Sequence, residues 1–577
     1  MRVLHEFRII LVLSCFATSC HGMFHKRARE FAGMAPGPDR MVRNLKHQFL
    51  SNQASAASTQ ELFQDAAAIG IGQARRFAKT GAHGKRKNNL ARDLIRACLK
   101  GTQWPPVHYV PIEVWDLETQ AVITVKLPVL FPHEIVFALA QRSSEAQLQN
   151  LDHACQMTKN NVARACVELS TPGLVAVGLW GDGVPCNFDR SQSLEMLTMS
   201  IVGPPSADNM RIPLTGINKK YLIKGKTWDQ VLEVLAWSFQ VLAIGIMPTN
   251  DHRGRLFQGK SRRWAGKKLP QAVLAEMRGD WGWFKTCFRF PQHNEVAGIC
   301  WRCNCTPRTL RQVGLDASWR GDTLNHWSLL QRMVALGVAL SPIWGAPCLR
   351  SSCFLVDWLH AADQGILLHF LAGLFKFCLS KYPGASQQER CKALFVDIKL
   401  FYRASAAESR LDNLTLSMLG EGGNKPPKLR ARAAESRGLV PFAVELATRF
   451  LDEGDELEST LKHCTLHLEQ CYKNLSPAVF SAASLRENSR KFCLLYVALE
   501  GMFDNKTKWH VTPKLHLFQE LCETMDSCPS LTWTYRDEDA GGTAMQISRR
   551  RGGANTVTNT ASSLLHRFVG NNPLPFL

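Results

Sequence analysis

The order of extended and helical segments between residues 174 and 280 constrains the fold of this chain more than any other feature. Leu174–Trp180 is a continuous apolar run that leads into Gly-Asp-Gly, the pattern of a buried strand followed by a turn signal. Further patterns follow in the order strand, strand, helix and strand, at residues 195–202, 211–217, 227–246 and 271–277. These segments predict a mixed α/β sheet.

Three acidic residues occur where such a sheet would present them. Asp182 follows the first strand, Asp280 follows the strand at 271–277, and Glu538 opens a short helical pattern at 538–551. Strand, strand, strand, helix and strand are the opening of an RNase H-like core, in which two strands and a packed helix each supply a carboxylate. We therefore predict the α/β fold class with an RNase H-like mixed sheet.

The three carboxylates favour divalent-metal chemistry on a phosphodiester. Two-metal sites use hard oxygen ligands to hold ions about 3.5–4 Å apart. Asp182, Asp280 and Glu538 are accordingly the predicted catalytic residues, with Mg²⁺ or Mn²⁺ as the cofactor. Two alternatives stay open, because Asp182 between two glycines also fits a turn, and Asp537 or Asp539 could replace Glu538.

The net charge of the chain indicates a polyanionic partner. The 577 residues include 69 Lys and Arg against 49 Asp and Glu, which gives a net charge of +20. A basic surface favours nucleic acid because neutralising phosphates releases counterions. One basic loop with interleaved aromatic residues is predicted to contact the DNA backbone, with a solvated loop as the alternative, through Arg253, Arg255, Lys260, Arg262 and Arg263.

Residues 1–105 are predicted to form a disordered, basic N-terminal segment. The run at 82–89 is too polar to pack, and it fits a DNA-contacting arm, a nuclear address or a solvated tail. We expect a nuclear protein on this basis. Residues 1–22 contain a short apolar run after two arginines, so secretion through a signal peptide is the alternative. Later apolar stretches carry charges and favour buried helices over membrane spans.

Cysteine spacing predicts a zinc site. The chain has 19 cysteines, and the Cys300-x-x-Cys303 pair can direct two thiolates at one ion. A pair is only half of a tetrahedral site, so two more ligands are needed. The predicted Zn²⁺ ligands are Cys300, Cys303, Cys353 and His360. Cys287 with His293 is an alternative second pair, and reduced cysteines in a loop are the alternative to any zinc site.

Five short blocks, taken in order, resemble a known family. They are Gly181-Asp-Gly-Val-Pro185, Gly279-Asp-Trp281, Cys300-Trp-Arg-Cys303, Asp357-Trp-Leu-His-Ala-Ala-Asp-Gln-Gly365 and, as a late block, Pro513-Lys-Leu-His516 with Trp533-Thr-Tyr-Arg-Asp-Glu538. Together they resemble the signature blocks of eukaryotic DDE transposases of the CACTA and KDZ/Plavaka type, over residues 170–545.

The resemblance implies an RNase H-like catalytic domain that is interrupted by a large, mostly α-helical insertion, with a small zinc-bound insertion ahead of it. Five segments are expected along the chain: the N-terminal segment, the first part of the core, the zinc insertion, the helical insertion, and the end of the core with a tail. Their ranges are 1–105, 106–286, 287–320, 321–508 and 509–577.

The activity implied by the resemblance is metal-dependent DNA cleavage and strand transfer, with Asp182, Asp280 and Glu538 holding the ions. Gly541-Gly542 is a poor continuation for the helix that carries Glu538, since each Gly costs roughly 1 kcal/mol relative to Ala. The alternative is therefore a catalytically inactive, transposon-derived module that binds DNA or protein. DNA is the expected partner, together with a homo-oligomer, and neither a membrane nor a small-molecule cofactor is expected.

Overall fold

The computed structural model describes residues 37–80, 89–187, 189, 191–291, 295, 298–405, 407–420, 426–503, 509–549 and 557–577. It is a mixed α/β structure that divides into two compact units. The ranges of these units are, in turn, Met1–Gln103 with His566–Pro573, and Trp104–Leu565 with Leu574–Leu577. Both the apolar run within 1–22 and the basic stretch at 82–88 lie outside the described residues.

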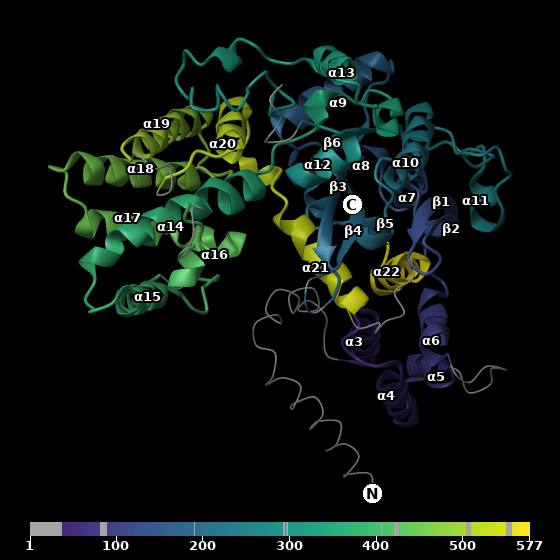
Figure 1. The fold of residues 1–577 in the computed structure, drawn as a ribbon. Coiled ribbons are helices and arrows are strands. Elements are labelled where there is room, and N and C mark those ends of the chain that lie inside the picture. The colour runs from purple at the N-terminus through teal and green to yellow at the C-terminus, as the bar shows by residue number, and fades with distance from the viewer. Residues whose placement is uncertain are drawn as a thin grey trace, which may run out of the picture. The chain divides into compact units, whose positions relative to one another are not determined.

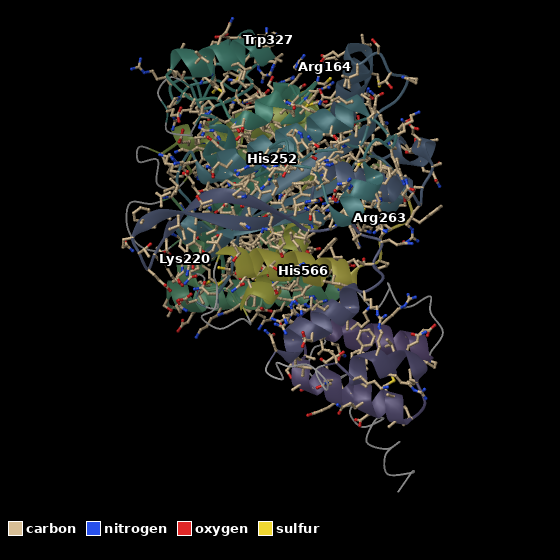
Figure 2. The ribbon with its side chains drawn as sticks, turned by 90° about the vertical axis from the view of Figure 1, so that its right-hand side faces the viewer. Arg164, Lys220, His252, Arg263, Trp327 and His566 are labelled. Atoms are coloured by element: carbon tan, nitrogen blue, oxygen red, sulfur yellow. The ribbon has the colours of Figure 1, made fainter. Side chains whose placement is uncertain are left out.

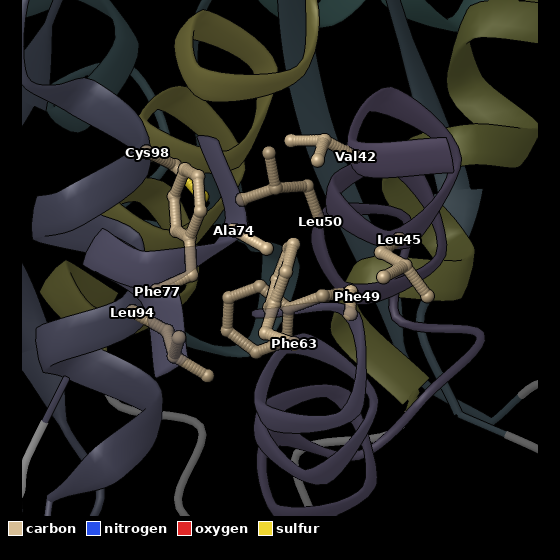
Figure 3. Close-up of a cluster of buried hydrophobic side chains, with 10 residues drawn as sticks. Val42, Leu45, Phe49, Leu50, Phe63, Ala74, Phe77, Leu94 and Cys98 are labelled. Carbon is tan, nitrogen blue, oxygen red and sulfur yellow. The ribbon is translucent and has the colours of Figure 1, made fainter. Parts of the chain in front are cut away.

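The first unit contains helices where the sequence predicted a disordered segment. These helices are α3 (Pro38–Leu50), α4 (Ala56–Ala68), α5 (Arg75–Ala78) and α6 (Leu90–Leu99). Figure 3 shows Phe49, Phe63 and Phe77 together in their core, where the rings of Phe63 and Phe77 stack with centroids 4.7 Å apart. The prediction of disorder is wrong for 37–80 and 89–99, because apolar residues recur there at helical spacing within a polar sequence.

The second unit contains the predicted mixed sheet. Its strands lie in the order β5-β4-β3-β6, with the bounds β3 (Val175–Pro185), β4 (Ser193–Ile201), β5 (Ile212–Asn218) and β6 (Ala272–Gly279). β3, β4 and β5 form an antiparallel meander, whereas β6 runs parallel to β3. β5 and β6 are buried along their whole length, and β6 buries the charged residues Glu276 and Arg278 among its apolar ones.

Helices and a separate hairpin surround this sheet. The chain passes from β5 to β6 through α10 (Thr227–Ile244), which contacts both β6 and the first strand of the hairpin. Thr227 Oγ1 donates a 2.8 Å hydrogen bond to the carbonyl of Glu113 in that strand. The hairpin strands and the remaining helices of this part are β1 (His108–Asp116), β2 (Ala121–Val129), α7 (Pro132–Ala140), α8 (Glu145–Leu148), α9 (Gln156–Glu168), α11 (Gly259–Trp264) and α12 (Trp281–Phe288).

Most described elements between β6 and residue 501 are helical. Figure 1 shows a group of them packed on one another, and α18 contacts both α17 and α19. One helical stretch, Leu359–Lys381, is long and apolar enough to span a membrane, but 78% of its most apolar window is buried inside the fold, as in a core helix. The α-helices are α13 (His326–Ala335), α14 (Leu367–Cys378), α15 (Gln387–Ala404), α16 (Ala433–Gly438), α17 (Val440–Phe450), α18 (Glu456–Lys473) and α19 (Ala482–Gly501).

One of the described C-terminal helices returns the chain to the sheet. These helices are α20 (Pro513–Thr524), α21 (Tyr535–Arg549) and α22 (Val557–Asn571). α21 lies beside β3 and β4 (Figure 1), and its Ala544 and Ile547 pack with Trp180 and Met196 of those strands. The helix continues through Gly541-Gly542, so these glycines do not end it. This packing places α21, which begins at Tyr535, against β3, the strand that carries Asp182.

Candidate metal-binding sites

Asp182 lies within β3 and is not a turn residue. β3 continues through Gly-Asp-Gly to Pro185, and Asp182 pairs with Met196 of β4. The flanking glycines have a packing role instead. A Cβ on Gly181 would lie 2.1 Å from Cε2 of Trp283, and one on Gly183 would lie 2.8 Å from Oε1 of Glu195. The rigid indole ring of Trp283 leaves no room for a Cβ on Gly181, whereas a side chain at position 183 would have to displace Glu195.

Asp280 lies beside β3, at the point where β6 ends. Gly279 of β6 pairs with Gly181, and Asp280 then forms the N-cap of α12, where its Oδ1 accepts a 2.5 Å hydrogen bond from the backbone N–H of Trp283. The cap occupies one carboxylate oxygen and fixes the orientation of the other. Its charge is near enough to Asp182 to raise the pKa of that carboxyl.

Glu538, and not either acidic neighbour, faces Asp182. It lies in the first turn of α21. Its Oε1 is 3.8 Å from His360 Nε2, and Oδ2 of Asp182 is 4.0 Å from the same nitrogen. Ligand atoms of Asp182, His360 and Glu538 all come within 4.8 Å of one another, and Asp280 is outside that group.

Asp537 points into a separate buried ion pair. Its Oδ1 is 2.5 Å from Nε of Arg211, just before β5, and its Oδ2 is 3.6 Å from Nη1 of Arg278 in β6. Asp539 is exposed, and it points to the side of the helix opposite to Asp537. Of the three acids, Glu538 is therefore the one that lies beside Asp182 and His360.

His360 is held in place by Asp357, which precedes it by three residues. Nδ1 of His360 lies 2.6 Å from Oδ2 of Asp357, so Nε2 faces the carboxylates. Asp357 is buried, and it also accepts hydrogen bonds from the backbone N–H and the hydroxyl of Thr534, at 3.0 and 2.8 Å. Since Thr534 precedes α21, this carboxylate connects His360 to the helix that carries Glu538.

The electrostatics of this group favour a cation. Burial raises the pKa of Asp182 well above its usual value, and the charges of Asp280 and Glu538 add to that effect. Burial, with smaller contributions from Asp357 and Asp537, likewise raises the pKa of Glu538 to about 7. Converging carboxylates disfavour ionisation unless a positive charge lies between them, so these shifts are typical of a functional site.

A lysine that the sequence did not single out lies at the edge of the group. Lys514 of α20 lines a cavity of about 180 Å³ together with Asp280, Asp357 and His360. Burial lowers the pKa of Lys514 to about 8. Its place in the Pro513-Lys-Leu-His516 block, two residues before His516, was the sequence feature that could have identified it. The Lys514 ammonium group is therefore a positive charge near Asp280, and this charge is lost on mild alkalinisation.

The zinc ligands predicted from the sequence do not come together as expected. Cys300 and Cys303 lie close to His516 and Glu520, and ligand atoms of these four are within 4.8 Å of one another. His360 instead belongs to the carboxylate group. Cys353 is buried elsewhere, where its backbone N–H bonds to the Arg350 carbonyl.

The alternative second pair of zinc ligands gains no support either. Cys287 is buried at the end of α12, and burial raises the pKa of its thiol well above the usual value. His293 lies outside the described residues. Local spacing could not indicate the contact between Cys303 and His516, because His516 lies 213 positions after Cys303.

The predicted DNA-contacting residues lie on and around α11, and several of them have partners within the protein. Arg255 forms an ion pair with Asp251, with Nη2 2.7 Å from Oδ2, and Lys260 donates a 2.7 Å hydrogen bond to the carbonyl of Trp104. Arg253, Arg262 and Arg263 are exposed, and Arg263 is labelled at the surface in Figure 2. The loop therefore offers exposed guanidinium groups to a polyanion.

Comparisons with known proteins do not assign a family. No protein-family model matches this chain, and no curated protein matches it. The chemistry open to the chain must therefore be inferred from its own residues. They provide one group of hard oxygen donors with a histidine, and one group of buried thiols with a histidine.

Proposed function

We propose that this chain is a transposase-derived DNA-binding protein, in which an RNase H-like domain cleaves and joins DNA strands with divalent metal ions. The observation that carries the proposal is the approach of Asp182 and Glu538, from segments more than 350 residues apart in sequence, to one histidine, with Asp280 beside them. Carboxylates on a strand, after a parallel strand and on a packed helix are the arrangement that such a site needs.

The sheet supports an RNase H-like domain. A sheet of that kind joins an antiparallel meander to a further strand that is parallel to its first strand, and β5-β4-β3-β6 has this arrangement. A single parallel bridge between Met277 and Phe354 continues the sheet beyond β6. The helices α13 to α19 lie between Asp280 and Glu538 in sequence, which agrees with a helical insertion at that point.

The donor set fits Mg²⁺ or Mn²⁺. Both ions prefer oxygen ligands, and the acids supply them. Among the described residues, no hydrogen-bond partner reaches the buried Oε1 of Glu538. An unpaired buried carboxylate oxygen is costly without a partner, and a cation supplies one. Bound ions would activate the attacking oxygen and stabilise the leaving oxygen of the phosphodiester.

The side chains of the site have distinct roles in this function. Asp182, Asp280 and Glu538 would hold the ions, and Asp280 is oriented by its cap on α12. His360, oriented by Asp357, faces the carboxylates with Nε2 and can hold a proton beside them. The exposed arginines around α11 would bind the phosphate backbone and need no base contacts to do so.

Metal-dependent nicking of DNA tests the proposal. The purified chain should nick supercoiled plasmid with Mg²⁺ or Mn²⁺ and not with EDTA. Asp182→Asn, Asp280→Asn and Glu538→Gln should each abolish nicking. Asp539→Asn is the matched control, because it removes an exposed acid next to Glu538 and should leave nicking unchanged.

Two outcomes would contradict the strand-cleaving function. If the chain retained DNA on a filter but nicked it with neither ion, an inactive DNA-binding module would be the correct description. If the chain bound neither DNA nor Mn²⁺, both forms of the proposal would fail.

A further inference from the structure

Strand β1 and the loop that leads into α11 line a cavity that the proposed strand cleavage does not use. Its volume is about 260 Å³, larger than that of the cavity beside Asp357. Pockets for drug-sized ligands measure about 300–1,000 Å³, so this cavity suits a smaller molecule. The lining includes His108, Phe131, His252, Phe257, Gln258 and Ser261.

Aromatic rings form one part of this lining. The rings of His108 and Phe131 are stacked with their centroids 4.3 Å apart, and Phe257 meets His108 edge-on at 5.6 Å. Both phenylalanines are buried, and Nε2 of His108 hydrogen-bonds Oε2 of the buried Glu134 at 2.8 Å. The fold therefore holds these rings in place. Flat aromatic surfaces bind other flat rings by stacking, and every nucleobase has a face that can stack in this way.

Two polar side chains of the lining lack the hydrogen bonds that buried groups normally make. Ser261 is 2% exposed, and its Oγ has no hydrogen-bond partner among the described residues. Both ring nitrogens of His252 are buried and have no partner in the same part of the chain. Burial lowers the pKa of the His252 imidazole, so at neutral pH the ring offers one donor and one acceptor. A ligand that hydrogen-bonds these groups relieves the cost of leaving them unpaired.

The loop that carries His252 is folded around Asp251. Oδ1 of Asp251 accepts hydrogen bonds from the backbone N–H groups of Arg253 and Arg255, both at 2.9 Å. Its Oδ2 lies 2.7 Å from Nη2 of Arg255. This side of the cavity is therefore formed without a ligand, which lowers the cost of ordering the loop when a ligand binds.

Exposed guanidinium groups lie next to the cavity. Arg255 lines it, and the side chain of Arg255 is 60% exposed. Arg262 and Arg263 directly follow Ser261 in α11 and are exposed as well. Positive charges at this place favour a ligand that carries phosphate. A nucleotide is the ligand class that uses all three features, because it has a flat ring, an edge of donors and acceptors, and a phosphate.

We propose that this cavity holds one unpaired nucleobase, whose ring stacks on the aromatic lining and whose edge hydrogen-bonds His252 and Ser261. The base has two possible sources, a free nucleotide or a DNA strand from which one base is turned out. Binding is non-covalent in both cases. This inference goes beyond the backbone contacts of the proposed function, and it does not require strand cleavage.

Paired ligands with and without a base test the proposal on the full-length chain. Calorimetry compares dAMP with deoxyribose phosphate, and filter binding compares a DNA duplex that has a one-base bulge with the same duplex that has an abasic bulge. The chain should favour the base-bearing member of at least one pair by about 10- to 100-fold, as stacking of one base implies. Preference for dAMP identifies a free nucleotide as the source, whereas preference only within the duplex identifies a base turned out of DNA.

Substitutions at exposed glutamines assign the preference to the cavity. Gln258 is exposed and lines the cavity, so Gln258→Trp should block it and abolish the preference without disturbing the core. Gln141→Trp is the matched control, because Gln141 is exposed outside the lining and its replacement should leave the preference unchanged. Equal unfolding midpoints of the two variants would show that both are folded.

Two further variants separate recognition of the base from binding of phosphate. His252→Ala should reduce the preference about 5- to 100-fold, because it removes a hydrogen-bonding partner of the base. Arg263→Ala should weaken binding of both duplexes equally and leave their ratio unchanged.

All binding is measured in EDTA, so a chain that fails to nick DNA still gives an answer here. Equal binding of both members of each pair would overturn the proposal. A preference that persists in Gln258→Trp would overturn its assignment to this cavity.

Discussion

Gly541 of α21 lies so close to β3 that a Cβ on it would be 2.7 Å from Cγ1 of Val184. The helix that carries Glu538 therefore approaches the strand that carries Asp182 at a distance that only glycine allows. Gly542, the next residue, has no neighbouring atom within 4 Å of such a Cβ. Two adjacent glycines that look equivalent in the sequence are thus different in the structure.

This difference predicts opposite effects for two alanine substitutions. Gly541→Ala should destabilise the protein by about 1–3 kcal/mol, because the added methyl overpacks the contact with β3. Gly542→Ala should stabilise it by up to about 1 kcal/mol through helix propensity. Thermal unfolding of both variants measures the effects. Equal destabilisation by the two would contradict the close approach.

Thr534 is predicted to act on the candidate site through Asp357. Thr534→Val removes the hydroxyl that donates to the buried carboxylate, which should cost about 1–3 kcal/mol of stability. Plasmid nicking should fall about 10- to 100-fold, because His360 is then less well oriented. Thr534→Ser keeps the hydroxyl and serves as the control. A nicking rate that is unaffected by Thr534→Val would separate Asp357 from the function.

Asp363 gives a pH-dependent stability that a neutral variant lacks. Burial raises its pKa from 3.8 to about 7, although the hydroxyls of Tyr472 and Tyr535 donate to it at 2.6 Å. The folded state then holds a proton that the unfolded state releases, so this contribution to stability is full below the unfolded pKa and is lost as pH rises through about 7.

The measurement for Asp363 is the difference in unfolding midpoint between the wild type and Asp363→Asn. The wild type should lose stability relative to the variant as pH rises from about 4 to about 7, and no further change should follow above that range. Asp539→Asn, which alters an exposed acid, should show no such difference. A flat difference for Asp363→Asn would mean that the carboxyl does not hold its proton.

Mn²⁺ binding at the carboxylate group should strengthen with pH. Metal ligands must lose their protons, and the raised pKa values of Asp182 and Glu538, the latter about 7, delay that loss. Affinity measured by calorimetry should therefore rise between about pH 6 and about pH 8, with protons released at the lower pH. Glu538→Gln should weaken binding at both values. Binding that is independent of pH would contradict the carboxylate site.

The strands and their acids were predictable because the signals for them are local. The apolar run before Asp182 and the strand before Asp280 are continuous in sequence, and the structure has strands at both places. The turn reading of Asp182 is wrong, because Gly181 and Gly183 accommodate neighbouring side chains and do not bend the chain. The catalytic roles of the acids stay predictions.

Long-range partners and weakly patterned helices were not predictable in the same way. His516 contacts Cys303 across 213 positions of sequence, so no local pattern pairs the two. The helices around Phe49 and Phe63 were hidden by a polar, basic composition that is typical of disorder. A direct count of apolar residues at helical spacing over 38–68 would have found them.

The buried pairing of Asp537 with Arg211 and Arg278 fixes the rotation of α21 about its own axis. Consecutive residues on a helix point about 100° apart, so anchoring one acid in the protein interior decides where the next one is aimed. The double variant Asp537→Glu with Glu538→Asp keeps the composition and the net charge. It changes the length of the side chain at both positions, by one methylene group each. Asp537 is thus the residue that sets the direction in which Glu538 points.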